Sequence, residues 1–186
     1  KTGLPLVMIT GKPNPPIHTK YTIRDCGPKQ FLWLINHCTY FIEDSFHATA
    51  FSIIFEKQFL FCDDHEKSYE RGRALLDRLG LAECYNFVEW ESLLEKKIDF
   101  HHANLVLKED IDASIDYLKY CIDNSRNTGK QIKRKKVGII TYSDSLNWGA
   151  QLQSYALREA VDSISPEIFA KQIDHRRMNT NRYRKR

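Results

Sequence analysis

The sequence lacks the features that mark the more specialised classes of protein. It contains no internal repeat and no apolar run near the roughly 20 residues that a membrane-spanning helix needs. Its five cysteines are widely spaced and form no CxxC pair, which argues against a zinc site or a disulfide framework. It opens at Lys1 with neither an initiator Met nor a signal-peptide pattern, so we expect the true N-terminus to lie elsewhere. A hydrophobic content of 42%, with 12% aromatics, then predicts an ordinary globular core.

Acidic residues are missing from two stretches of the chain, 126–136 and 175–186. These stretches hold 12 of the 28 basic residues, which leaves 16 basic against 24 acidic residues in the rest of the chain. The body is therefore acidic, and the net charge of +4 comes from a basic linker and a basic tail. No aromatic platform or groove motif accompanies these runs, so we expect no nucleic acid partner.

Apolar runs alternate with amphipathic stretches through residues 4–80. Strands are expected at 4–10, 39–42 and 58–62, and helices at 28–38, 46–55 and 68–79, the last one ending at Gly80. A short helix over 90–97 and a final helix capped by Asp110 complete this part. Such alternation predicts the α/β class, with a Rossmann-like parallel sheet covered by helices on both faces.

The pattern restarts after the basic linker. A strand at 137–142, a loop at 143–148, a helix at 149–161 and a strand at 167–173 form one βαβ unit. A unit of about 50 residues cannot bury both faces of its own sheet. We therefore divide the chain into a domain at 1–124, a linker at 125–136 and a partial second domain at 137–186. The partial domain must lean on the first one, on a partner chain or on further sequence.

His47 is the first candidate for a functional residue. It follows the expected strand 39–42, and ligands of open parallel sheets bind beyond the C-terminal ends of the strands. The N–H groups that open the next helix attract anions, and Ser45 and Thr49 add hydroxyls at the same turn. An imidazole there titrates near neutral pH. The alternative is that Asp44 or Ser45 only caps the helix while His47 packs or points to solvent.

Two stretches of this first part resemble the polysaccharide pyruvyl transferase family. Residues 27–32 read Gly-Pro-Lys-Gln-Phe-Leu, and residues 45–52 read Ser-Phe-His-Ala-Thr-Ala-Phe-Ser. The family carries a similar Gly-Pro-x-x-Phe-Leu helix and a Ser-Phe-His-Gly-Thr-Ala-Phe-Ser run, followed by an Arg like Arg71 ahead of a Leu-Leu-x-x-Leu-Gly-Leu helix. This resemblance covers residues 4 to about 124 and corresponds to the C-terminal half of the family. Ala48 departs from the pattern, since the family commonly has Gly at this position. The resemblance implies that its methyl group narrows the approach of a phosphate to the backbone.

A further stretch resembles the start of the same family. Residues 147–153 read Asn-Trp-Gly-Ala-Gln-Leu-Gln, similar to the family's Asn-Tyr-Gly-Ala-x-Leu-Gln loop, and the resemblance covers 136 to about 176. In the family this loop faces the cleft between two domains. The alternatives are that Gly149 only permits close helix–strand packing and that Asn147 only caps a helix. No GxGxxG fingerprint is present, so we expect no dinucleotide.

The resemblance implies a fold like one domain of a glycosyltransferase-B architecture. It implies the transfer of a pyruvyl group from phosphoenolpyruvate to sugar hydroxyls of a cell-surface polysaccharide precursor, as in bacterial exopolysaccharide biosynthesis. His47 would be the catalytic acid or a phosphate contact, and Arg71 a clamp for carboxylate or phosphate unless it pairs with Glu66 or Glu70. The remaining substrate-binding candidates are Ser45, Thr49, Asn147, Gly149 and Gln153. Neither a metal nor another cofactor is expected.

The two resembling parts stand in reversed order. We therefore expect a slice across the junction of two adjacent pyruvyl transferases, or a truncated product, that is inactive or weakly active alone. Its partners would be phosphoenolpyruvate, a sugar or lipid-linked oligosaccharide acceptor, and a second copy or a complementing domain. We expect it in the cytoplasm, with the inner face of the membrane as the alternative. The alternative functions are a nucleotide-sugar-dependent glycosyltransferase and a non-catalytic remnant or binding module.

Overall fold

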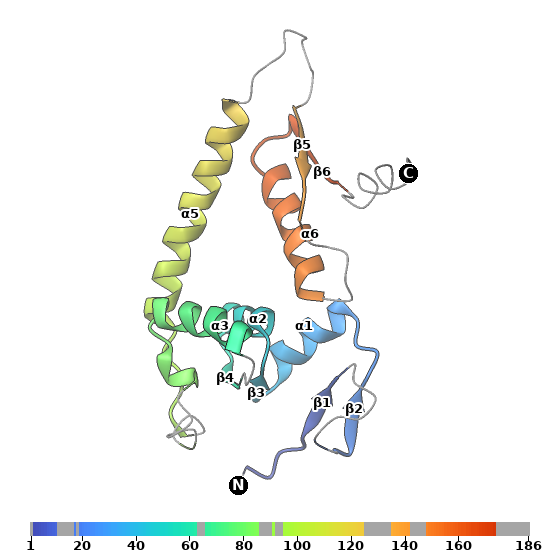
Figure 1. The fold of residues 1–186 in the computed structure, drawn as a ribbon, viewed down its shortest axis with the longest axis vertical. Helices are drawn as coiled ribbons and strands as arrows, with labels where there is room; N and C mark the ends of the chain where they lie inside the picture. The colour runs from blue at the N-terminus through green and yellow to red at the C-terminus, as the bar shows by residue number, and fades with distance from the viewer. Residues whose placement is uncertain are drawn as a thin grey trace, which may run out of the picture.

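The computed structural model describes residues 2–10, 17, 19–62, 66–85, 91, 95–124, 135–141 and 148–173, without the side chains of 66–69 and 148. The predictions for the loop at 143–147, the linker up to residue 134, the basic tail and most of the helix at 90–97 lie outside these residues, while Trp148, expected in the loop, is helical. Figure 1 shows two parts: strands and short helices at the N-terminal end, and a βαβ unit beside a long helix.

The first part alternates strands and helices, as its sequence pattern predicts. In chain order the elements are β1 (Val7–Ile9), β2 (Tyr21–Ile23), α1 (Pro28–His37), β3 (Tyr40–Glu43), α2 (Phe46–Ile54), β4 (Gln58–Phe61), α3 (Glu66–Arg78), the 3-10 helix η1 (Ala82–Tyr85) and α5 (His101–Asp123). The second part contains β5 (Lys135–Ile139), α6 (Trp148–Asp162) and β6 (Ile168–Gln172).

All described strands pair in parallel, and each belongs to a two-stranded sheet: β1 with β2, β3 with β4, and β5 with β6. Tyr40 lies opposite Gln58 in the second sheet, and Lys135 lies opposite Ile168 in the third. Parallel neighbours need a crossover, which α2 and α6 provide. The α/β class with parallel pairing is thus confirmed, while the described strands form three pairs and no single larger sheet.

Several elements differ from the prediction. The strand β5 begins at Lys135, inside the linker expected at 125–136. The helix expected to begin at Asp110 begins at His101, because its first turns bury Ala103 and pack Val106 against the core of the first part. Asp110 does not cap this helix, and its carboxylate instead accepts two hydrogen bonds from the Arg78 guanidinium on α3, at 3.2 and 2.5 Å. The strand β2 was not predicted, since three residues are too few to show a period.

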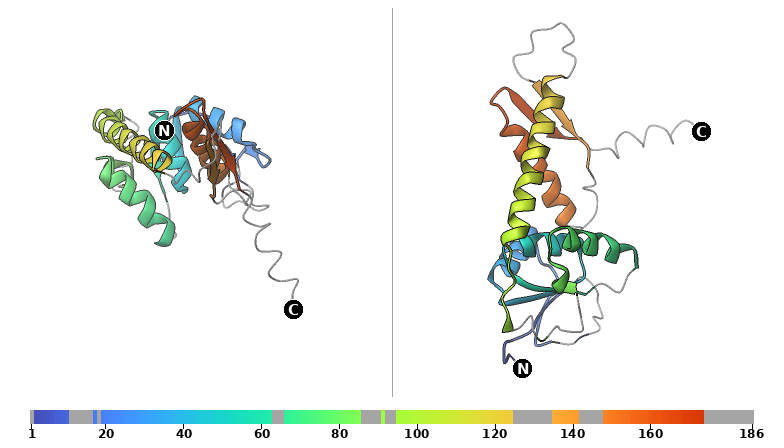
Figure 2. Two further views of the ribbon diagram at one scale, coloured as in Figure 1. Left: turned by 90° about the horizontal axis from the view of Figure 1, so that it is seen from above. Right: turned by 90° about the vertical axis from the view of Figure 1, so that its left-hand side faces the viewer.

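The helix α5 belongs to both hydrophobic cores of the molecule. Its N-terminal half packs on the cluster around Phe61, Leu76 and Leu79, which are fully buried. Its C-terminal end contributes Leu118 and Ile122 to a second cluster formed by β5, α6 and β6. Figures 1 and 2 show α5 rising from the first part along the βαβ unit. The unit therefore leans on the first part of its own chain, one of the three alternatives left open by the sequence.

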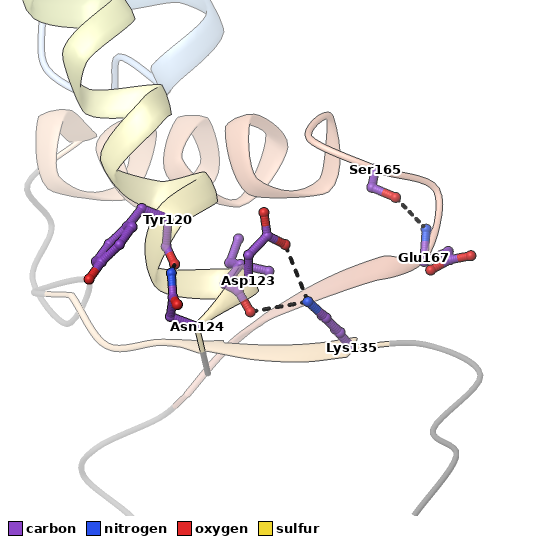
Figure 3. A network of polar contacts seen from close by, with 7 residues as sticks. Tyr120, Asp123, Asn124, Lys135, Ser165 and Glu167 are labelled. Atoms are coloured by element: carbon purple, nitrogen blue, oxygen red, sulfur yellow. Dashed lines mark hydrogen bonds and ion pairs between the residues drawn. The ribbon is translucent and has the colours of Figure 1, made fainter. Parts of the chain in front are cut away.

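A small polar network closes the upper end of this junction (Figure 3). The Lys135 ammonium at the start of β5 donates to the Ile122 carbonyl at 3.2 Å and contacts an oxygen of Asp123 at 3.3 Å. A cation near the last carbonyls of a helix is favourable. Because Asp123 is exposed, we expect the ion pair itself to contribute no more than about 1 kcal/mol. Burial of Ile122 therefore holds the junction more strongly than the ion pair.

Candidate functional site

His47 lies in the first turn of α2, directly after β3. Ser45 takes the N-cap position with extended backbone (φ −123°, ψ 126°), but its hydroxyl makes no capping hydrogen bond. The Ser45 N–H instead donates to Oε2 of Glu43 at 2.7 Å. Capping by the Ser45 side chain, one of the alternatives left open by the sequence, is therefore not what organises this turn.

Thr49 follows one turn later and points into the protein interior. Its side chain is fully buried, and its hydroxyl donates to Oε1 of Glu43 at 2.6 Å and approaches the Ser45 carbonyl at 3.2 Å. The exposed Ser45 side chain remains on the outside of the same turn. In the structure the Thr49 hydroxyl contacts Glu43. A direct contact of Thr49 with substrate stays a prediction.

The N-terminal end of α6 contacts α2 (Figure 1). This contact brings together the two stretches that resemble the pyruvyl transferase family, residues 45–52 and 147–153. Gly149 is buried, and a Cβ placed on it would overlap the Cβ and Cγ atoms of His47 and lie 2.5 Å from its Cδ2. A hydrogen bond joins the Gln153 side chain, one turn further along α6, to the His47 ring. His47 and Gly149, about 100 positions apart, are thus in direct contact. They can approach this closely because Gly149 has no side chain.

Arg71 approaches the same place from α3. Its guanidinium carbon lies 5.9 Å from the centre of the Phe46 ring, and Phe46 in turn meets the His47 ring edge-on with centroids 5.9 Å apart. No ion pair joins Arg71 to Glu70 within the described residues, and the side chain of Glu66 lies outside them. The guanidinium is exposed and remains close enough to His47 to act on its charge.

The surroundings of His47 disfavour its protonated form. Partial burial lowers the pKa of the imidazole, and the positive charge of Arg71 lowers it further, while the hydrogen bond that the ring makes to the Gln153 side chain opposes both effects. Cys62 follows β4 nearby, and the pKa of its thiol is raised to about 11. Burial is the larger cause, and the negative charges of Glu43 and Asp44 add to it. At neutral pH the site therefore presents a neutral imidazole beside a guanidinium, with a protonated thiol that is a poor nucleophile.

The lowered pKa of His47 predicts a loss of stability in mild acid. An unfolded histidine takes up a proton near pH 6.5, whereas folded His47 takes it up only at lower pH. The unfolded state therefore binds more protons in this window, and stability falls as pH drops below about 6.5. We expect a His47→Gln variant to lose less stability than the wild type between pH 7.5 and pH 5.5 in denaturant titrations. Equal losses would contradict the assigned environment.

The structure brings four of the seven candidate residues together, namely His47, Arg71, Gly149 and Gln153. Ser45 lies at the edge of this group, Thr49 lies beneath it, and Asn147 lies outside the described residues. Two further residues of the site were not predicted from the sequence. Glu43 gives no signal beyond an acid at the end of an apolar strand, and Phe46 contacts both His47 and Arg71. The described residues contain no group of acidic, histidine or cysteine side chains arranged to hold a metal ion.

Comparisons with family models, curated proteins and solved structures give no match to this chain. Within the described parts of the chain, none of the helices combines the length and apolar character needed to cross a bilayer. A function must therefore be inferred from the geometry of the site.

Proposed function

We propose that this chain carries a phosphoenolpyruvate half-site of a polysaccharide pyruvyl transferase. One observation supports the proposal above all: the histidine of the Ser-Phe-His run and the glycine of the Asn-Trp-Gly-Ala-Gln-Leu-Gln stretch are in contact, although about 100 residues separate them. The two stretches resemble the family independently of each other. Their meeting is expected if both belong to one site, and it has no reason to occur if either resemblance is accidental.

The chemistry of the site suits an anionic donor. Phosphoenolpyruvate carries a phosphate and a carboxylate, and a guanidinium such as that of Arg71 binds either group with two parallel hydrogen bonds. The negative charge of the donor would raise the pKa of His47 again, so that binding brings a proton to the imidazole. His47 would then donate this proton to C3 of the enol. Two sugar hydroxyls then add to C2 in turn, and a pyruvate ketal remains. One of their protons returns to the imidazole, and the other leaves with the phosphate as hydrogen phosphate.

The reversed order of the two stretches does not prevent them from meeting within one chain. The helix α5 carries the backbone to the second core, β5 runs back toward the first part, and α6 therefore begins beside α2. Activity would not then depend only on segments from another chain, as the order alone led us to expect. Within this proposal the parts resemble a Rossmann-like domain and the opening unit of a second domain of a glycosyltransferase-B fold. The acceptor is a sugar or a lipid-linked oligosaccharide, and the reaction takes place in the cytoplasm.

Donor binding can be tested by thermal unfolding with and without millimolar phosphoenolpyruvate. A ligand at about 100 times its dissociation constant stabilises a fold by roughly 2.7 kcal/mol. For a chain of this size that is a rise of about 5–11 °C in melting temperature. We expect the rise in the wild type and its loss in His47→Ala, because the imidazole takes up a proton on binding. His101→Ala, which removes an exposed histidine at the start of α5, should retain it.

The same titration separates the alternatives. A rise with a nucleotide sugar and none with phosphoenolpyruvate would replace the proposal by a glycosyltransferase. A chain that responds to neither ligand, with His47→Ala equal to the wild type, would overturn the proposal in favour of a non-catalytic module.

A further inference from the structure

The carboxylate of Glu43 is the least expected group near the site. Glu43 ends β3 and is 7% exposed, although isolated buried carboxylates are costly and rarely retained without partners. Its main chain is fixed by the parallel sheet, in which Glu43 lies opposite Phe61 and its carbonyl accepts a hydrogen bond from the Cys62 N–H at 2.7 Å. The backbone position from which the Glu43 side chain extends is therefore fixed by the sheet.

Both carboxylate oxygens are used on the same helical turn. Oε2 accepts the Ser45 N–H at 2.7 Å, and Oε1 accepts the Thr49 hydroxyl at 2.6 Å. His47 lies midway between these two anchor points. Hydrogen bonds to a charged acceptor are about twice as strong as neutral ones, and negative charge is favourable at a helix N-terminus. The carboxylate thus clamps the turn that carries the imidazole.

From these contacts we infer that Glu43 is a positioning residue, which holds the first turn of α2 so that the His47 ring stays seated against Gly149 and within reach of Gln153. Its importance for catalysis rests on the proposed function, but its effect on His47 does not. Among the residues that the structure describes, the groups that face the ring are Arg71 from α3, Gln153 from α6 and Phe46 from its own helix. Glu43 acts on the ring through the backbone, and no contact between the two side chains is needed.

The inference is tested by following the His47 ring with NMR titrations of the full chain labelled on histidine, without any donor. In Glu43→Ala the turn loosens and the ring gains access to solvent, so its pKa should rise toward the value near 6.5 of an exposed imidazole. Glu43→Gln should restore the wild-type titration, because its amide oxygen accepts the Ser45 N–H and its NH₂ group donates to the Thr49 oxygen. Glu167→Gln, an exposed acid in the turn before β6, serves as the charge control and should change nothing.

A second variant covers the case in which Glu43→Ala does not fold. Thr49→Val keeps the shape of the buried side chain and removes only one of the two anchor points, so it should give a smaller shift in the same direction. Folded variants at either position that titrate His47 as the wild type does would overturn the inference. Donor affinity is then measured separately, with at least a fivefold loss expected in Glu43→Ala. A wild type that binds no phosphoenolpyruvate would reject the proposed function and leave the titration result standing.

Discussion

Replacing Gly149 by Ala should destabilise the chain and separate α6 from α2. The new Cβ would overlap the Cβ and Cγ atoms of His47, which belong to the root of that side chain and cannot swing aside as a flexible tip would. Alanine is favoured over glycine in a helix by about 1 kcal/mol, but insertion into a packed contact typically costs about 1–3 kcal/mol. The difference is a net loss of up to about 2 kcal/mol, and we expect the upper part of this range because the overlap is with atoms that cannot rotate away. Urea unfolding and a lower melting temperature would both report this loss.

A double-mutant cycle identifies the cause of this loss. In the His47→Ala background the ring atoms are gone while Cβ remains, so Gly149→Ala should cost less there, with a coupling of at least about 0.5 kcal/mol. Gly138→Ala on β5 is the matched control, because its Cβ would meet only the end of the Ile173 side chain, which can rotate away. Additive costs at positions 47 and 149 would mean that the two residues do not touch in solution. The observation that supports the proposed function would then be lost.

The parts of the fold that could be predicted are those with a strong local signal. Pro28 opens α1 at its first position, as expected for a residue without an N–H group. Gly80 adopts the left-handed conformation (φ 70°) after α3, and the Leu81 N–H closes the helix by donating to the Leu76 carbonyl at 2.8 Å. Such signals depend only on neighbouring residues, so the sequence displays them directly.

The missed parts depend on partners that are distant in sequence. Asp110 carried a valid capping signal, yet its carboxylate pairs with Arg78, which lies 32 positions earlier. The burial of Glu43 follows from the packing of β3 and α2, and a charged residue at a strand end gives no sign of it. Likewise His47 and Gly149 were each predicted as site residues, but no rule of spacing relates a residue in α2 to one in α6. Their contact depends on the course of α5 between the two cores.

Replacing Gly72 by Ala should disturb both the core and the site. Gly72 lies in α3 against the ring of Phe61, the last residue of β4. A Cβ there would lie 2.8 and 2.9 Å from Cε1 and Cε2 of Phe61 and overlap the Cζ atom. Phe61 is fully buried, so its ring has no free space to enter. The helix must move outward instead, and we expect a loss of about 1–3 kcal/mol in free energy of unfolding. Chemical denaturation of the two chains measures it directly.

Arg71, which precedes Gly72 in α3, relates the position of this helix to the pKa of His47. Moving α3 outward moves Arg71 away from Phe46 and His47, and the pKa of His47 should rise because a nearby positive charge withdraws. Arg71→Ala should raise the same pKa while changing stability by less than about 0.5 kcal/mol, since its side chain is exposed. The two variants therefore share the electrostatic effect and differ in stability. If Gly72→Ala has the stability of the wild type and an unchanged pKa of His47, the Phe61 ring must move instead of α3. The expected displacement of Arg71 would then be wrong.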